Sequence, residues 1–78
     1  MNEEPSLRST RIAKHSLVIA GHRTSISLED AFWFGLKRIA GTEGRALANL
    51  VAEIDATRGE ANLSSAIRVF VLERLSRG

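Results

Sequence analysis

The feature that most constrains this chain is residues 22–28, in which polar and apolar residues alternate. In a β-strand successive side chains point to opposite faces, so Arg23, Ser25 and Ser27 share one face. The residues between them share the other face, which can be buried. We see no second strand in the chain to pair with this one, yet the backbone groups of a strand must find partners. We therefore expect it to pair with the same strand of a second copy.

The polar face of this strand is typical of a surface that reads DNA. A two-stranded antiparallel ribbon fits the major groove. Arginine is the commonest reader of guanine, through O6 and N7, and a serine hydroxyl can donate or accept a hydrogen bond. We therefore predict that Arg23, Ser25 and Ser27 are base-reading residues. The plainer interpretation is that they are ordinary exposed residues of a strand.

The composition favours a small domain that gains stability by association. The chain has 78 residues, enough for one domain, and 44% of them are apolar, too many for a disordered chain. It contains no cysteine, and two histidines are too few for a structural zinc site. Domains of this size bury a limited fraction of their surface, so a second copy is the expected source of additional core. We expect no metal and no cofactor.

Positive charge is concentrated near the start of the chain. The net charge is only +2, but residues 5–28 hold four basic residues and no acidic one. From Glu29 onward, seven basic and seven acidic residues cancel. Localised positive charge is typical of a contact with a polyanion, although a solvated basic tail gives the same pattern. Three of these basic residues are candidate DNA contacts from an N-terminal arm: Arg8, Arg11 and Lys14.

The start of the chain divides into an arm and a strand region. Residues 1–14 are polar and without period, and we expect them to form a flexible basic arm before a single domain at residues 15–78. Gly21 interrupts a β-branched stretch. Residues 16–28 therefore fit either one long strand with a bulge or a short strand followed by the ribbon strand.

Three helices are expected after the strand. Apolar residues at helical spacing predict helices over residues 29–42 and 46–57. A third begins at Asn62, a competent N-cap. The fold class is therefore mainly α, with one N-terminal β-strand and a third, C-terminal helix. The predicted shared core comprises Ile26, Leu28, Phe32, Leu36, Ile39, Leu47, Leu50, Val51 and Ile54. The predicted buried face of the third helix comprises Leu63, Ala66, Ile67, Phe70, Val71 and Leu75.

Strand, helix, glycine-containing turn and helix is the order found in ribbon-helix-helix regulators. Residues 23–28 resemble the ribbon signature of that superfamily (Arc, MetJ and CopG), and Glu43-Gly44-Arg45 resembles its inter-helix turn. More narrowly, the chain resembles a family of short bacterial ribbon-helix-helix domains. The two sequence stretches that characterise that family, in the ribbon and in the third helix, are nearly identical at residues 18–29 and 62–68 of this chain.

The resemblance implies a homodimer whose strands form an intermolecular antiparallel two-stranded ribbon in the major groove. The three polar residues of the strand face then read base edges. It also implies that a DNA phosphate is held where the second helix starts, at Arg45, Ala46 and Leu47. Family members often have serine or threonine in place of Ala46. Alanine supplies no hydroxyl, so the backbone N–H groups and Arg45 remain to bind the phosphate.

No catalytic arrangement is visible in the sequence. Glu53 and Asp55 diverge on one helix, and the serines lack a nearby histidine base with an orienting acid. No apolar run approaches the length of a membrane span, and the acidic start is unlike a secretion signal. We therefore expect a cytoplasmic protein that is not an enzyme and has no membrane partner.

The combined prediction is a homodimer that binds double-stranded DNA sequence-specifically and acts as a transcriptional repressor or autoregulator. Higher-order assembly on DNA is left open. The first alternative is an antitoxin-type protein that binds a partner toxin and regulates its own operon. The second is a dimerisation module without DNA binding, which a salt titration distinguishes because DNA binders lose affinity steeply as salt rises.

Overall fold

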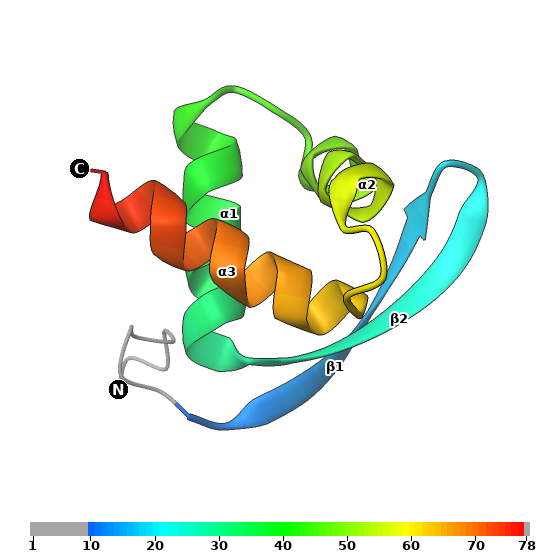
Figure 1. The fold of residues 1–78 in the computed structure, drawn as a ribbon, viewed down its shortest axis with the longest axis horizontal. Coiled ribbons are helices and arrows are strands. Elements are labelled where there is room, and N and C mark those ends of the chain that lie inside the picture. Colours follow the sequence, from blue (N-terminus) through cyan, green and yellow to red (C-terminus); the bar gives the residue numbers. More distant parts are fainter. Residues whose placement is uncertain (1–9, 78) are drawn as a thin grey trace, which may run out of the picture.

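The computed structural model describes residues 10–77 and contains a β-hairpin followed by three helices (Figure 1). The elements are β1 (Ile12–Ile19), β2 (His22–Glu29), α1 (Asp30–Thr42), α2 (Leu47–Thr57) and α3 (Leu63–Ser76). The helices lie over one face of the hairpin and leave its other face uncovered (Figure 1). The helix predictions are confirmed to within one residue at each predicted boundary.

The prediction of a single strand with no partner in its own chain is wrong. β2 pairs antiparallel with β1 along its whole length. The connecting residues Ala20 and Gly21 have φ angles of 51° and 82°, and a type I′ hairpin turn requires positive φ at both positions. Such a turn brings the chain straight back beside itself. Residues 12–14, expected in the arm, therefore belong to the hairpin, and a ribbon forms within one chain.

Ala20→Asn should stabilise this turn. A left-handed backbone costs alanine roughly 1–2 kcal/mol, whereas asparagine tolerates it and is preferred in type I′ turns. We expect the free energy of unfolding to rise by about 1 kcal/mol, which corresponds to roughly 4–8 °C in melting temperature at fixed protein concentration. Gly21→Ala, which adds a β-carbon at the second positive φ, should lower it. An Ala20→Asn chain that melts below the parent would contradict the argument.

The core lies between the inner face of the hairpin and the helices. Ile26 and Leu28 of β2 are buried there, as their alternation predicts. Gly35 lets α3 approach α1 closely, since a β-carbon on it would lie 2.9 Å from Cγ1 of Val71. The prediction fails for Leu75, which is 43% exposed. The buried apolar residues are Ile19, Ile26, Leu28, Leu36, Ile39, Ala40, Leu50, Val51, Ile54, Ile67 and Val71.

His15 joins the inner face of β1 to α1. Its ring stacks on Trp33 with centroids 3.8 Å apart and planes 8° apart. Its Nε2 is buried and has no hydrogen-bond partner among the described residues. Burial disfavours the charged ring and lowers the pKa of His15, while Asp30, Lys37 and Arg11 have smaller effects on it. A neutral, stacked His15 therefore holds the hairpin against α1.

The chain should lose stability as the pH falls through the ordinary range of histidine. The unfolded chain binds a proton at His15 near pH 6.5, whereas the folded chain binds it only at lower pH. The stabilisation by neutral His15 is thus fully present above about pH 6.5 and is lost as the pH falls toward the lower pKa of the folded chain. Melting temperatures between about pH 7.5 and pH 5.5 measure it, and His15→Phe, which keeps an aromatic stack, should flatten the profile. An equally steep profile in that variant would assign the effect to another group.

Candidate nucleic-acid interface

The side chains predicted to read DNA lie together on the uncovered face of the hairpin. Arg23, Ser25 and Ser27 are all exposed, whereas Ile26 and Leu28 between and beyond them are buried. The strand therefore has the two-faced character that its alternation predicts.

β1 adds three more residues to this face. Lys14, Ser16 and Val18 lie directly opposite the three residues of β2 in the hairpin register, and opposed residues of an antiparallel pair point to the same side. All three are exposed, Val18 by 58%. Lys14, predicted as an arm contact, thus belongs to the sheet. Ser16 and Val18 were not predicted, because the glycine at position 21 left the pairing of residues 12–19 with β2 undefined. We call this surface the outer face: Lys14, Ser16, Val18, Arg23, Ser25 and Ser27.

The two other predicted arm contacts differ in position. Arg8 lies outside the described residues. Arg11 immediately precedes β1, and its Nε lies 2.9 Å from Oδ2 of Asp30. Its carbonyl accepts a hydrogen bond of 2.7 Å from the Asp30 N–H. Arg11 is therefore anchored at the base of the hairpin, with a side chain that stays largely exposed.

β2 has one edge paired with β1 and one edge turned away. The backbone bond of Asp30 continues the ladder, so the even-numbered residues of β2 make the bonds to β1. The N–H and C=O groups of Arg23, Ser25 and Ser27 therefore point away from β1. Ser64 of α3 occupies one of them, because its Oγ donates a hydrogen bond of 2.8 Å to the Ser27 carbonyl. We call the backbone groups of Arg23 and Ser25 the open edge.

α3 fixes the end of β2 at a second point. Nε of Arg68 lies 2.9 Å from Oε1 of Glu29, and this contact holds the pKa of the Glu29 carboxyl below its ordinary value. The helix itself starts as predicted: the Asn62 side chain accepts a hydrogen bond of 2.8 Å from the Ser65 N–H. A capped helix start thus stands beside the open edge.

At the predicted phosphate site, the start of α2, Arg45 is already paired within the chain. Its guanidinium lies 3.6 Å from the carboxylate of Glu43 and forms an ion pair with Glu53. Glu43 also pairs with Arg74 of α3. Ala46, the N-cap before Leu47, makes no side-chain capping bond. A phosphate here would compete with two carboxylates for Arg45, which the sequence pattern did not indicate.

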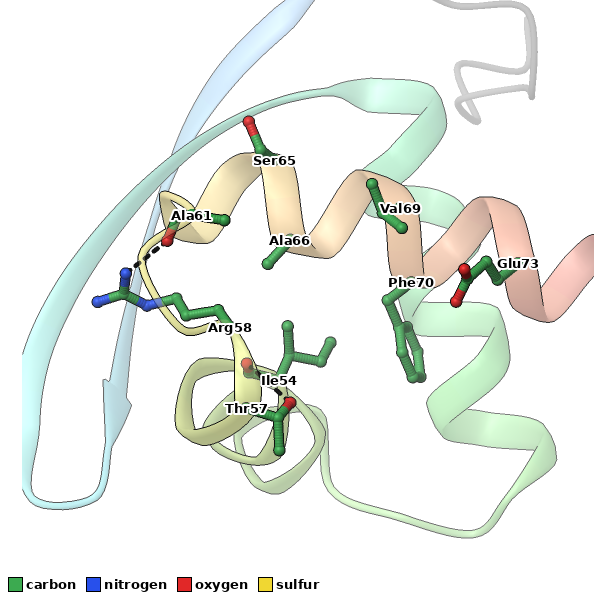
Figure 2. Close-up of a pocket in the computed structure, with 9 residues that line it drawn as sticks. All are labelled: Ile54, Thr57, Arg58, Ala61, Ser65, Ala66, Val69, Phe70 and Glu73. Carbon is green, nitrogen blue, oxygen red and sulfur yellow. Dashed lines mark hydrogen bonds between the residues drawn. The ribbon is translucent and has the colours of Figure 1, made fainter.

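A groove of about 350 Å³ lies between α2 and α3 (Figure 2). Its apolar lining includes Ile54, Val69 and Phe70. Arg58 also lines the groove, and its Nη1 donates a hydrogen bond of 2.6 Å to the carbonyl of Ala61, another lining residue (Figure 2). The surface of the groove is mainly apolar, unlike the polar and cationic outer face.

A strand ribbon with a cationic polar face, set on a small helical core, is the arrangement of small DNA-binding domains. The chain belongs to the ribbon-helix-helix domain family, whose model matches residues 12–75, from the first residue of β1 nearly to the end of α3. Members of this family are generally DNA-binding transcription regulators and not enzymes. No curated protein and no solved structure matches the chain. None of the helices within residues 10–77 has the length and apolar character of a membrane span.

Proposed function

We propose that this protein binds specific sequences of double-stranded DNA through the outer face and thereby represses or autoregulates transcription. The outer face supports this, because it gathers two cations and three hydroxyls on one exposed side of a ribbon. Arg23 has the donor pattern that suits guanine O6 and N7, and Ser25 and Ser27 can donate to or accept from other base edges. The nearest carboxylate on β2, that of Glu29, is already engaged by Arg68.

The proposed binding unit is a homodimer joined at the open edges. The backbone groups of two antiparallel strands complement one another across a two-fold axis. The strands would then run β1, β2, β2, β1, with the reading residues of the two β2 strands at the centre of the groove. Each β1 lies about 4.8 Å further out, near the groove wall, where Lys14 can reach phosphates. The intrachain hairpin thus widens the predicted intermolecular ribbon by one strand on each side.

Selection of duplexes from a random pool tests the proposal. We expect a two-fold symmetric site that binds at least about a thousandfold more tightly than a scrambled duplex at moderate salt. Fluorescence anisotropy measures both affinities over a series of salt concentrations. Equal affinity for the two duplexes would overturn sequence-specific binding, and no binding even at low salt would overturn DNA binding itself.

Lys14→Ala should weaken binding to every duplex by a similar factor. A phosphate contact carries no sequence information, and each such contact adds about 0.9 to the slope of log affinity against log salt. The slope should therefore fall, for the selected and the scrambled duplex alike. Lys37→Ala, which removes the same charge from the exposed side of α1, is the matched control. A changed sequence preference in Lys14→Ala would instead make Lys14 a base reader.

The antitoxin alternative remains a prediction. It requires a protein partner, and the mainly apolar groove between α2 and α3 is the surface where we would expect such a partner to bind. Co-purification of a small partner protein with the full chain, followed by a test of its toxicity, would favour it.

A further inference from the structure

We infer that α3 sets the register of the dimer. In this register the two-fold axis passes between the two copies of Thr24, and therefore Arg23 of one chain lies opposite Ser25 of the other. The inference rests on the proposed homodimer and states which residues of the two β2 strands lie opposite each other, which the fold of one chain does not define. It follows from the contact between Ser64 and Ser27.

The open edge of β2 is shortened at one end by α3. The Ser64 hydroxyl already donates to the Ser27 carbonyl at 2.8 Å. A ribbon centred on Ser25 would require that carbonyl to accept from the partner's Arg23 N–H. It would also draw the partner strand toward the start of α3, whose second turn is held to the end of β2 by the contact of Arg68 with Glu29. Both contacts oppose this register.

Moving the axis by one residue removes the conflict. With Thr24 at the axis, Arg23 and the partner's Ser25 exchange backbone bonds, and every group of the open edge is used. Ser27 then faces the partner's Gly21, which lies in the turn, is exposed and carries no side chain. A ribbon centred on Arg23 is worse, because it leaves Ser25 opposite that turn. The Thr24 register thus pairs the whole open edge and keeps the Ser64 contact.

This register makes each reading site a joint product of two chains. On the outer face, Arg23 would have Val18 of its own chain on one side and the partner's Ser25 on the other. The two copies of Arg23 would lie diagonally across the axis, about 7–8 Å apart. With Ser25 at the axis they would be about 14 Å apart, four residues along the strands. The selected DNA site should therefore carry its guanines close to its centre.

Cysteine cross-linking tests the register directly, because the chain contains no cysteine. The two copies of Thr24 would form a non-hydrogen-bonded pair with Cα atoms about 4.5 Å apart, within the range that a disulfide spans. Under mild oxidation of the full chain, Thr24→Cys should give several-fold more cross-linked dimer than Arg23→Cys or Ser25→Cys. Thermal unfolding of each variant checks that it remains folded.

A change at Ser64 provides the second measurement. Ser64→Ala frees the Ser27 carbonyl and should raise the cross-linking of Ser25→Cys several-fold, whereas Ser64→Thr, which keeps the hydroxyl, should not. Strongest cross-linking at Ser25→Cys in the parent background would overturn the register while leaving the homodimer intact. Dimeric mass by light scattering without cross-linking at any of the three positions would overturn the register and move the interface elsewhere. Monomeric mass in the parent chain would overturn the homodimer itself.

Discussion

Ser25→Pro should make the protein monomeric and weaken its binding to a selected duplex by on the order of a hundredfold or more. The Ser25 N–H points away from β1, so proline removes a donor from the open edge and no bond from the hairpin. The backbone before it, at Thr24, is already extended, as a residue preceding proline must be. A lone hairpin presents half of the proposed reading residues, and losing the linkage between two binding modules typically costs a factor of about 100–10,000.

Ser16→Pro is the matched control. Ser16 lies directly opposite Ser25 on the outer face, and its N–H points away from β2, toward the other edge of the hairpin. We expect this variant to remain dimeric by light scattering and sedimentation over a range of concentrations. Thermal unfolding should show both proline variants folded. A dimeric Ser25→Pro beside a monomeric Ser16→Pro would place the interface at β1.

Arg23→Ala should abolish most of the sequence preference without dissociating the dimer. Loss of a bidentate contact to guanine costs roughly 1–3 kcal/mol, and the dimer presents two such arginines. Because the open edge is made of backbone groups, truncation of the side chain leaves the pairing of the strands in place. Anisotropy should show a large loss with the selected duplex and a small one with the scrambled duplex.

Arg23→Lys separates charge from geometry in the same experiment. Lysine keeps the positive charge but lacks the planar fork of the guanidinium. It should therefore retain the salt dependence and lose selectivity at the guanine. Full, sequence-selective binding by Arg23→Ala would remove Arg23 from the reading surface.

The inner and outer faces of β2 could be predicted from the sequence, because strand periodicity is a local property. Ile26 and Leu28 are buried and Arg23 is exposed, as the alternation requires. The pairing partner of a strand cannot be read from the strand's own residues. Here it depends on a turn in which Ala20 occupies the position where asparagine is usual, so the sequence lacked the common signal of a hairpin.

The charges around α2 show the same limit. The glycine-containing turn and the apolar stripe predicted the helix and its start correctly. The pairing of Glu43 with Arg74 depends on how α3 packs, and it joins residues 31 positions apart. The family resemblance implied that Arg45 faces a phosphate, but the sequence did not show that the fold brings the carboxylates of Glu43 and Glu53 to its guanidinium.

The intrachain hairpin has a consequence for how the protein would respond to its own abundance. Since one chain pairs its own strands and buries a set of apolar residues beneath them, we expect a folded monomer to exist, unlike in obligate dimers that have no stable subunit. Folding and assembly are then separate equilibria. At low cellular levels most copies would be single and inactive, and occupancy of a symmetric operator would rise with the square of protein concentration. An autoregulator built this way has a threshold, and subunits of related chains could exchange without unfolding.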